Sequence, residues 1–272
     1  MSSATAPSSI RLLLLGATGE TGRQVLASAL SSPAVSQVHT FGRSTPKTVD
    51  QDTPGFSKLV HTSLDYEKLL VGEDHGAEAK KLKEANADVV LCTLGTTRKT
   101  AGSAEAFEKI DREYVLKAAE AARIEGKPQK MIYLSSGGAS SSSPFLYPKS
   151  KGLTEEGLAA LGYDQTIIFR PGLLVVPGGR KGDHRLAESL FGSDLPFLPK
   201  LTGVLSHFTD SMQIETPLLG RALVNAAVAT GELAPRFAQP EKLAGGRYSV
   251  VAVNNASAMK LGSANEEELR QA

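Results

Sequence analysis

The chain has 272 residues, of which 41% are hydrophobic and 22% are charged, and its formal net charge at pH 7 is +1. This length is enough for one large domain or two small ones. A net charge so close to zero gives the protein no overall positive potential that would attract nucleic acid or anionic membranes. A single cysteine, Cys92, excludes an internal disulfide, and no apolar run approaches the ~20 residues of a transmembrane segment. Residues 1–9 are uncharged and rich in Ser, Ala and Pro, which predicts a short disordered arm and no signal peptide.

Apolar runs and amphipathic stretches alternate from residue 10 to residue 170. The apolar runs predict six strands, which end near Leu15, Phe41, Val60, Thr93, Ser135 and Arg170. Crossover helices are predicted over residues 21–30, 77–86, 104–125 and 149–161. Such alternation predicts an α/β fold: a Rossmann-like, doubly wound parallel sheet with helices on both faces and a ligand crevice at the carboxyl ends of the strands.

Three glycines spaced three apart join the first strand to the first helix. Gly16 allows the tight turn, Gly19 lets the backbone approach a phosphate, and Gly22 lets the helix and the strand pack closely. The free N–H groups at the start of the helix favour an anion. The turn is therefore a predicted dinucleotide site, and its candidate residues are Gly16, Thr18, Gly19, Glu20, Thr21 and Gly22.

The end of the second predicted strand indicates which dinucleotide binds. A site that prefers NAD(H) places a carboxylate there for the ribose 2′-hydroxyl. Between Val35 and Lys47 the chain has no acidic residue, but it has Arg43, whose guanidinium suits a 2′-phosphate. The sequence thus favours NADP(H) as the cofactor. The five histidines show no metal-site spacing, and no metal is assigned.

Tyr147 and Lys151 are four residues apart and share one face of the predicted helix. A nearby ammonium lowers the pKa of a phenol, which suits a tyrosine that donates a proton to a carbonyl. The preceding strand ends in Ser135 and Ser136, either of which is placed to hold the substrate oxygen. Pro148 disfavours helical geometry at Tyr147, so a helix that begins there would loosen the four-residue spacing.

The regular alternation breaks after Arg170, because residues 172–213 are rich in Gly and Pro. A helix is predicted again over 216–229 and a strand over 247–253. We therefore expect residues 10–272 to form a single NAD(P)-binding Rossmann domain. Residues 172–272 would contain a small C-terminal elaboration on the substrate side of the crevice.

These motifs together resemble those of an atypical short-chain dehydrogenase/reductase. Within that superfamily the chain is most similar to the HIV Tat-interacting oxidoreductase group and its fungal mitochondrial-proteome relatives. The resemblance covers residues 10–192 and rests on residues 15–23, 94–98, 110–117 and 134–136, Tyr147 with Lys151, and residues 169–174.

The resemblance implies that Tyr147 is the proton donor, that Lys151 binds the nicotinamide ribose, and that Ser136 rather than Ser135 polarises the carbonyl, although both serines stay candidates. It also implies further cofactor contacts, which are Asp65 beside the adenine, Gly95, Leu134, Pro171, Leu173 and Arg180. The superfamily usually has an asparagine in the long helix that completes a proton relay, and Asp111 stands in its place here.

The expected function is NADPH-dependent reduction of a small carbonyl substrate. The alternative is a regulatory protein that senses NADPH and binds a protein partner with little turnover, and a nucleotide-sugar epimerase ranks third because residues 172–272 leave little room for a sugar lobe. A cytoplasmic location is expected first. Peripheral attachment to the mitochondrial outer membrane comes second, by analogy with the fungal relatives.

Overall fold

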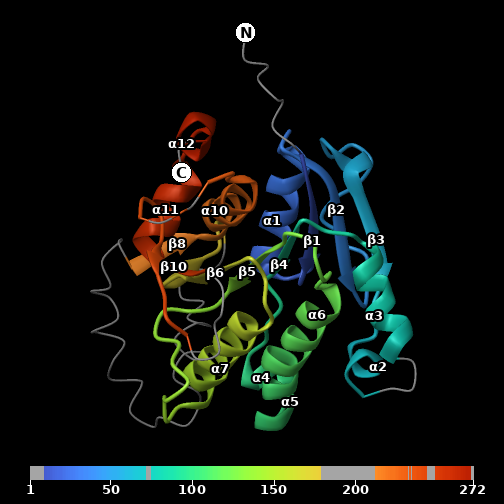
Figure 1. Cartoon of the computed structure of the whole chain (residues 1–272), viewed down its shortest axis with the longest axis vertical. Helices are drawn as coiled ribbons and strands as arrows, with labels where there is room; N and C mark the ends of the chain where they lie inside the picture. Colours follow the sequence, from blue (N-terminus) through green and yellow to red (C-terminus); the bar gives the residue numbers. More distant parts are fainter. Residues whose placement is uncertain are drawn as a thin grey trace.

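A central sheet of eight strands, in the order β3-β2-β1-β4-β5-β6-β10-β9, organises the molecule (Figure 1). The structure is a computed structural model and describes residues 9–71, 75–178, 212–231, 233, 235–243 and 249–270. The strands are β1 Ile10–Leu15, β2 Val35–Gly42, β3 Leu59–Ser63, β4 Val89–Cys92, β5 Lys130–Leu134, β6 Gln165–Arg170, β9 Gln239–Pro240 and β10 Ser249–Asn254. All run parallel except β9, which confirms the predicted doubly wound, Rossmann-like sheet.

The central strands β1 and β4 are apolar and buried over Leu12–Leu15 and Val89–Cys92, because helices cover both faces of the sheet. In β1, Leu12 and Leu14 face one layer, formed by α1 (Glu20–Ser31), α10 (Thr216–Val228) and α11 (Asn255–Ser263). Leu13 and Leu15 face the opposite layer. That second layer holds α2 (Tyr66–Val71), α3 (His75–Glu84), α6 (Tyr114–Ala122) and α7 (Leu146–Ala160) (Figure 1). Two short helices, α4 (Arg98–Ala101) and α5 (Ala104–Glu108), lead into α6, and α12 covers Glu266–Arg270.

The long helix predicted over 104–125 is divided into two by a π-helical turn, Lys109–Glu113, and ends at Ala122. A π turn holds an extra residue, so it changes which side chains face inward. Asp111 is fully buried, whereas Ile110, which the helical period places on the inner face, is only half-buried. The sequence prediction of one regular helix was therefore wrong at this turn.

Helix α7 begins early enough to keep Tyr147 and Lys151 on one face. Phe145 is its N-cap, and Pro148 is the third helical residue. Proline is tolerated there because the first N–H groups of a helix have no partner within it. Because the helix begins at Leu146, Pro148 does not loosen the four-residue spacing of Tyr147 and Lys151.

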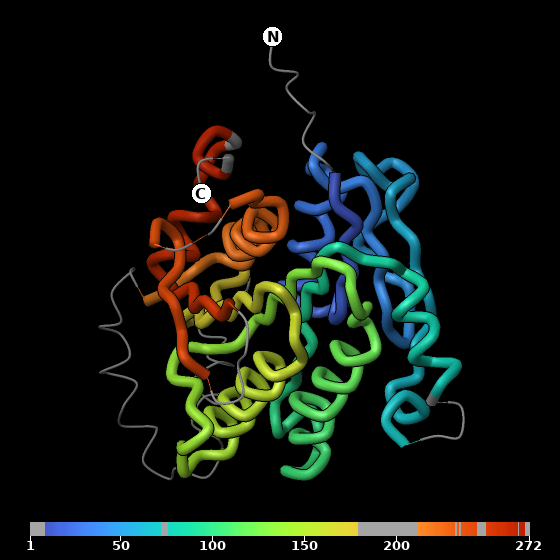
Figure 2. Tube along the Cα trace, in the orientation of Figure 1, coloured from blue at the N-terminus to red at the C-terminus, as the bar shows by residue number. Residues whose placement is uncertain are grey.

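The C-terminal part of the chain completes the main sheet instead of standing apart from it. Strand β10 lies beside β6, and the late segments lie on the side opposite β3, as the red and blue ends of the tube show (Figure 2). A second, two-stranded sheet pairs β7 (Leu173–Val175) with β8 (Gln213–Glu215). Within the described ranges no helix combines the length and the hydropathy needed to cross a bilayer. The predicted arm, apart from Ser9, and most of the irregular segment 172–213 lie outside the described residues.

Asn255, the first residue of α11, ties the turn after β6 to β8. Its Oδ1 accepts a hydrogen bond from the Gly172 N–H at 2.9 Å, and its Nδ2 donates to the Gln213 carbonyl at 3.1 Å. A Cβ on Gly172 would lie 2.1 Å from the carbonyl oxygen of Met212, so this turn packs directly against the backbone of the residue before β8. Residues far apart in sequence therefore hold the turn in place.

Gly220 sets the close approach of α10 to α1. A Cβ on Gly220 would lie 2.8 Å from the backbone carbonyl carbon of Gln24, which cannot move without shifting α1. We expect Gly220→Ala to lower the free energy of unfolding by about 1–3 kcal/mol, as measured by urea denaturation. Gly76→Ala is the matched control, because open space surrounds Gly76 in α3. Equal stability of Gly220→Ala and the wild type would contradict the close packing of the two helices.

Candidate active site and cofactor cleft

The glycine turn between β1 and α1 combines two crowded positions with one open position. Gly16 has a φ of +86°, and a Cβ there would lie 2.6 Å from the Leu94 backbone nitrogen. A Cβ on Gly22 would lie 2.0 Å from the Gly16 carbonyl oxygen. At Gly19 the nearest atom would be 3.5 Å away, an ordinary contact. Packing thus requires glycine at the two outer positions, and the middle glycine leaves bare backbone exposed.

The tip of this turn faces solvent at the start of α1. Thr18, Gly19 and Glu20 are exposed, whereas Thr21 is buried. The Glu20 carboxylate pairs with Arg23 in the first turn of α1. No side chain caps the helix at Gly19, so the first N–H groups of α1 are open to an anion.

A cavity of about 80 Å³ lies between the glycine turn and the ends of β2 and β3. Thr18, Arg43, Ser44, His61 and Tyr66 are among its lining residues, and no described lining residue is acidic. Sequence reasoning identified Arg43 but missed His61 and Tyr66. The signal was available, since β3 is parallel to β2 and its residues reach the same edge of the sheet.

Asp65 lies beside this cavity but does not line it. Its Oδ1 accepts hydrogen bonds from the backbone N–H groups of Glu67 at 2.9 Å and Lys68 at 3.1 Å. This is the pattern of a helix cap, here at the start of α2. The side chain thus has a structural partner, and its contact with adenine stays a prediction.

Lys151 is the centre of a buried cluster. Its Nζ lies 3.1 Å from Asp111 Oδ1, donates a hydrogen bond to the Tyr133 hydroxyl at 3.0 Å, and lies 5.9 Å from the centre of the Tyr147 ring. The side chains of Lys151 and Asp111 are 5% and 0% exposed. Sequence reasoning placed Tyr147, Lys151 and Asp111 in the site but missed Tyr133, which has the pattern of any apolar strand residue.

The cluster sets the protonation of its members. Burial raises the pKa of Tyr147 above its usual value of about 10, Lys151 and the neighbouring Ser136 hydroxyl lower it, Asp111 raises it, and the net shift is upward. Burial alone would lower the pKa of Lys151, but Asp111, Tyr133 and Tyr147 raise it well above its usual value. At neutral pH the site therefore holds a charged ammonium and a protonated phenol.

The two candidate serines have different surroundings. Ser135 Oγ donates a hydrogen bond to Glu155 Oε1 at 2.5 Å, and Glu155 Oε2 lies 2.6 Å from Arg170 Nη2. Ser136 Oγ is buried against the Tyr147 phenol and has no further hydrogen-bond partner among the described residues. This geometry favours Ser136 as the hydroxyl that is free to bind a substrate oxygen, and gives Ser135 a structural contact.

The serine-rich loop between Ser136 and Tyr147 is held against α7. Ser141 Oγ donates a hydrogen bond to Glu156 Oε1 at 2.6 Å, and a Cβ on Gly152 would lie 2.2 Å from the Ser141 backbone nitrogen. Because the loop is fixed to the helix, Ser136 and Tyr147 keep a defined separation.

The other predicted cofactor residues lie at the carboxyl edge of the sheet. Gly95 follows β4, Leu134 ends β5, and Pro171 and Leu173 follow β6. Pro171 is buried, Leu134 and Leu173 are half-buried, and Gly95 is exposed. Arg180 lies outside the described residues. The structure therefore brings the described candidates to the edge that holds the glycine turn.

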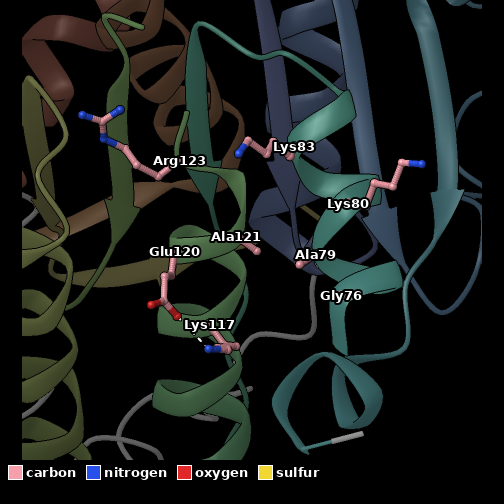
Figure 3. Close-up of a pocket in the computed structure, with 8 residues that line it drawn as sticks. All are labelled: Gly76, Ala79, Lys80, Lys83, Lys117, Glu120, Ala121 and Arg123. Atoms are coloured by element: carbon pink, nitrogen blue, oxygen red, sulfur yellow. Dashed lines mark hydrogen bonds and ion pairs between the residues drawn. The ribbon is translucent and has the colours of Figure 1, made fainter. Parts of the chain in front are cut away.

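Another hollow, of about 410 Å³, lies elsewhere, between α3 and α6 (Figure 3). It is lined by Gly76, Ala79, Lys80, Lys83, Lys117, Glu120, Ala121 and Arg123. Lys117 pairs with Glu120 at 2.8 Å, Arg123 Nε donates to the Gly162 carbonyl, and Figure 3 shows Lys80 and Arg123 pointing away from each other. The charged groups do not converge, and none of the predicted catalytic residues lines this hollow.

Solved structures with similar folds are reductases and related enzymes. The Bordetella bronchiseptica enzyme WbmF in complex with NAD+ has a TM-score of 0.58 at 13% identity, over 94% of this chain and 78% of that one. A short-chain dehydrogenase/reductase from Veillonella parvula in complex with NADP has a TM-score of 0.51 at 13% identity, over 89% of this chain and 93% of that one. At this identity the likeness concerns the fold.

Sequence relatives define the family, although no family model matches the chain. The mitochondrial protein FMP52 of Candida albicans is 41% identical over 179 residues, which are 65% of this chain and 72% of that protein. The mitochondrial protein fmp52 of Emericella nidulans is 34% identical over 79% of this chain and 86% of that protein. HTATIP2 of Rattus norvegicus is 38% identical over 67% of this chain and 70% of that protein. The chain therefore belongs to the family of FMP52 and HTATIP2, and its fold is the Rossmann-like fold of the solved short-chain dehydrogenases/reductases.

Proposed function

We propose that the protein is an NADP(H)-dependent oxidoreductase that reduces a small carbonyl compound. One observation carries the proposal: the buried Ser136 hydroxyl has no described partner beyond the Tyr147 phenol, and the helix of Tyr147 also supplies the charged Lys151. A phenol, an ammonium and a free hydroxyl in one place are the groups that a carbonyl reduction requires.

The residues present fit the cofactor. The uncapped start of α1 and the open Gly19 would hold the pyrophosphate, and Arg43 would pair with the 2′-phosphate. Lys151 would bind the nicotinamide ribose. The remaining proposed contacts are Gly16, Thr18, Glu20, Thr21, Gly22, Asp65, Gly95, Leu134, Tyr147, Pro171, Leu173 and Arg180.

When bound, the reduced nicotinamide supplies a hydride, which brings two electrons to the carbonyl carbon. Tyr147 gives its phenolic proton to the carbonyl oxygen, so the product is an alcohol. Ser136 donates a hydrogen bond to the same oxygen before and during this transfer. The Tyr147 phenolate then regains a proton from solvent, and the positive charge of Lys151 stabilises the phenolate in the meantime.

Titration calorimetry with NADPH and NADH, followed by a panel of aldehydes, ketones and quinones monitored by NADPH absorbance, tests the proposal. Binding of NADPH with oxidation by at least one carbonyl class supports it, and absence of binding to both coenzymes contradicts it. The raised pKa of Tyr147, which makes the phenol a weaker acid, favours one second candidate. This is an NADPH-sensing regulatory protein with a protein partner, expected to bind NADPH tightly without oxidising it.

Arg43→Ala tests the choice of cofactor. We expect the Kd for NADPH to rise about 10- to 100-fold, because a charge-assisted hydrogen bond to the 2′-phosphate is lost, while the Kd for NADH stays the same. Lys47→Ala is the control, since Lys47 is exposed on the same segment but does not line the cavity. Equal losses of affinity for both coenzymes would contradict a role of Arg43 at the 2′-phosphate.

For the location we propose the cytosol, with peripheral attachment to the mitochondrial outer membrane as the second possibility. The second is supported by the fungal relatives, which are named as mitochondrial proteins. We also propose that residues 10–272 act as one domain, since β10 pairs with β6 in the main sheet. Cell fractionation with carbonate extraction distinguishes the two locations.

A further inference from the structure

Asp111 and Lys151 form a buried pair of opposite charges at the base of the candidate site. The Asp111 Oδ1 atom lies 3.1 Å from Lys151 Nζ, and Asp111 has no exposed surface. Its second oxygen, Oδ2, has no hydrogen-bond partner among the described residues. The Lys151 ammonium is adjacent to this buried carboxylate, and removing either partner would leave a buried charge without its counter-charge.

Two local features place Asp111 at this position. The π-helical turn Lys109–Glu113 turns its side chain inward, in place of Ile110. On the other side, a Cβ on Gly95 would lie 3.0 Å from Asp111 Oδ1 and 3.5 Å from Lys151 Nζ. The backbone after β4 therefore packs directly on the pair.

The charges that act on the Tyr147 phenol are few. Among the described residues they are the Lys151 ammonium, from the same helix, and the Asp111 carboxylate, from the π-helical turn. The other titratable groups beside Lys151 are Tyr133 on β5 and Cys92 on β4. Burial raises the pKa of Cys92 to about 12 and raises that of Tyr133, so both are neutral at pH 7.

We propose that Asp111 is a positioning residue that offsets much of the Lys151 charge and thereby opposes ionisation of the Tyr147 phenol. The effect of this role on catalysis rests on the proposed function. A protonated phenol is the form that carbonyl reduction needs, whereas alcohol oxidation needs the phenolate. Asp111 would thus extend toward higher pH the range in which the site holds the form that reduces a carbonyl.

Tyrosine titration in the full-length protein tests this without substrate or coenzyme. The chain has six tyrosines, and ¹³C NMR of Cζ-labelled tyrosine follows each of them, with Tyr147→Phe identifying the signal of Tyr147. We expect Asp111→Asn to lower the pKa of Tyr147 by about one pH unit or more. Glu108→Gln, which removes a carboxylate that pairs with Arg112 one turn earlier, should leave that pKa unchanged. The same pKa for Tyr147 in the wild type and in Asp111→Asn would overturn the proposal.

A second pair of variants covers the case in which Asp111→Asn does not fold. Lys151→Met leaves the Asp111 charge beside the phenol, and Asp111→Asn/Lys151→Met removes both charges from nearly the same volume. We expect a larger ionised fraction of Tyr147 at pH 11 in the double variant than in Lys151→Met, and equal fractions would overturn the proposal. A shift of the Tyr147 pKa without NADPH binding contradicts the proposed function alone. Carbonyl reduction without such a shift contradicts this inference alone.

Discussion

Tyr147→Phe is expected to abolish most carbonyl reduction while leaving the coenzyme bound. The substitution removes the phenolic proton, and loss of a positioned general acid lowers kcat by about 10²- to 10⁴-fold. The ring itself should stay in place, because it packs at 6.0 Å from the Phe107 ring and at 5.9 Å from Lys151 Nζ. Stopped-flow and steady-state measurements of NADPH oxidation give kcat, and calorimetry gives the Kd for NADPH.

Tyr163→Phe is the matched control for that variant. Tyr163 is also buried, and its hydroxyl donates a hydrogen bond to the Ala119 carbonyl at 2.7 Å. Its loss should lower the free energy of unfolding by about 1 kcal/mol and leave kcat unchanged. If Tyr147→Phe kept the kcat of the wild type, the phenol would not be the proton donor.

Gly19→Ala and Gly22→Ala are expected to fail in different ways, although the two glycines belong to one motif. At Gly19 a methyl group meets only the Gly16 carbonyl oxygen at 3.5 Å, so the free protein should keep its melting temperature. The same methyl group would occupy the space that the pyrophosphate needs, and we expect the Kd for NADPH to rise at least about 10-fold. At Gly22 the methyl group would lie 2.0 Å from the Gly16 oxygen, and the fold itself should be destabilised.

Thermal denaturation without coenzyme and calorimetry with NADPH separate the two effects. Gly22→Ala should lower the free energy of unfolding by about 1–3 kcal/mol or more, because the contact is with backbone rather than with a flexible side chain. Gly76→Ala, with open space around it, should change neither measurement appreciably. Normal NADPH affinity in Gly19→Ala would show that the coenzyme does not approach the turn, and the proposed cofactor site would be wrong.

The sheet and the glycine turn could be predicted because their signals are local. β1 is apolar at every position from Leu12 to Leu15 since both of its faces are covered, and its last residue runs directly into Gly16. The predicted strands stop within a few residues of the observed ones, with β3 reaching Ser63 instead of Val60. Tyr147 and Lys151 were predictable for the same reason, because their spacing and the serines before them lie close together in sequence.

Features that depend on distant partners could not be predicted. The helical period favours Ile110 over Asp111 as the inner residue, and only the ammonium of Lys151, on another helix, accounts for the buried carboxylate. The choice between Ser135 and Ser136 also depends on a distant group, since Glu155 on α7 occupies the first of them. The pairing of β10 with β6 involves residues about eighty positions apart, and no local pattern specifies such a partner.

Asn255 has a consequence for the order in which the protein matures during translation. The turn at Gly172, next to two predicted coenzyme contacts, is anchored by a side chain that leaves the ribosome more than eighty residues later. Because domains assemble from the N-terminus as they are synthesised, a nascent chain arrested before Asn255 would contain the glycine turn and the Tyr147 helix without this anchor. Coenzyme capture would then follow the synthesis of Asn255 instead of preceding it.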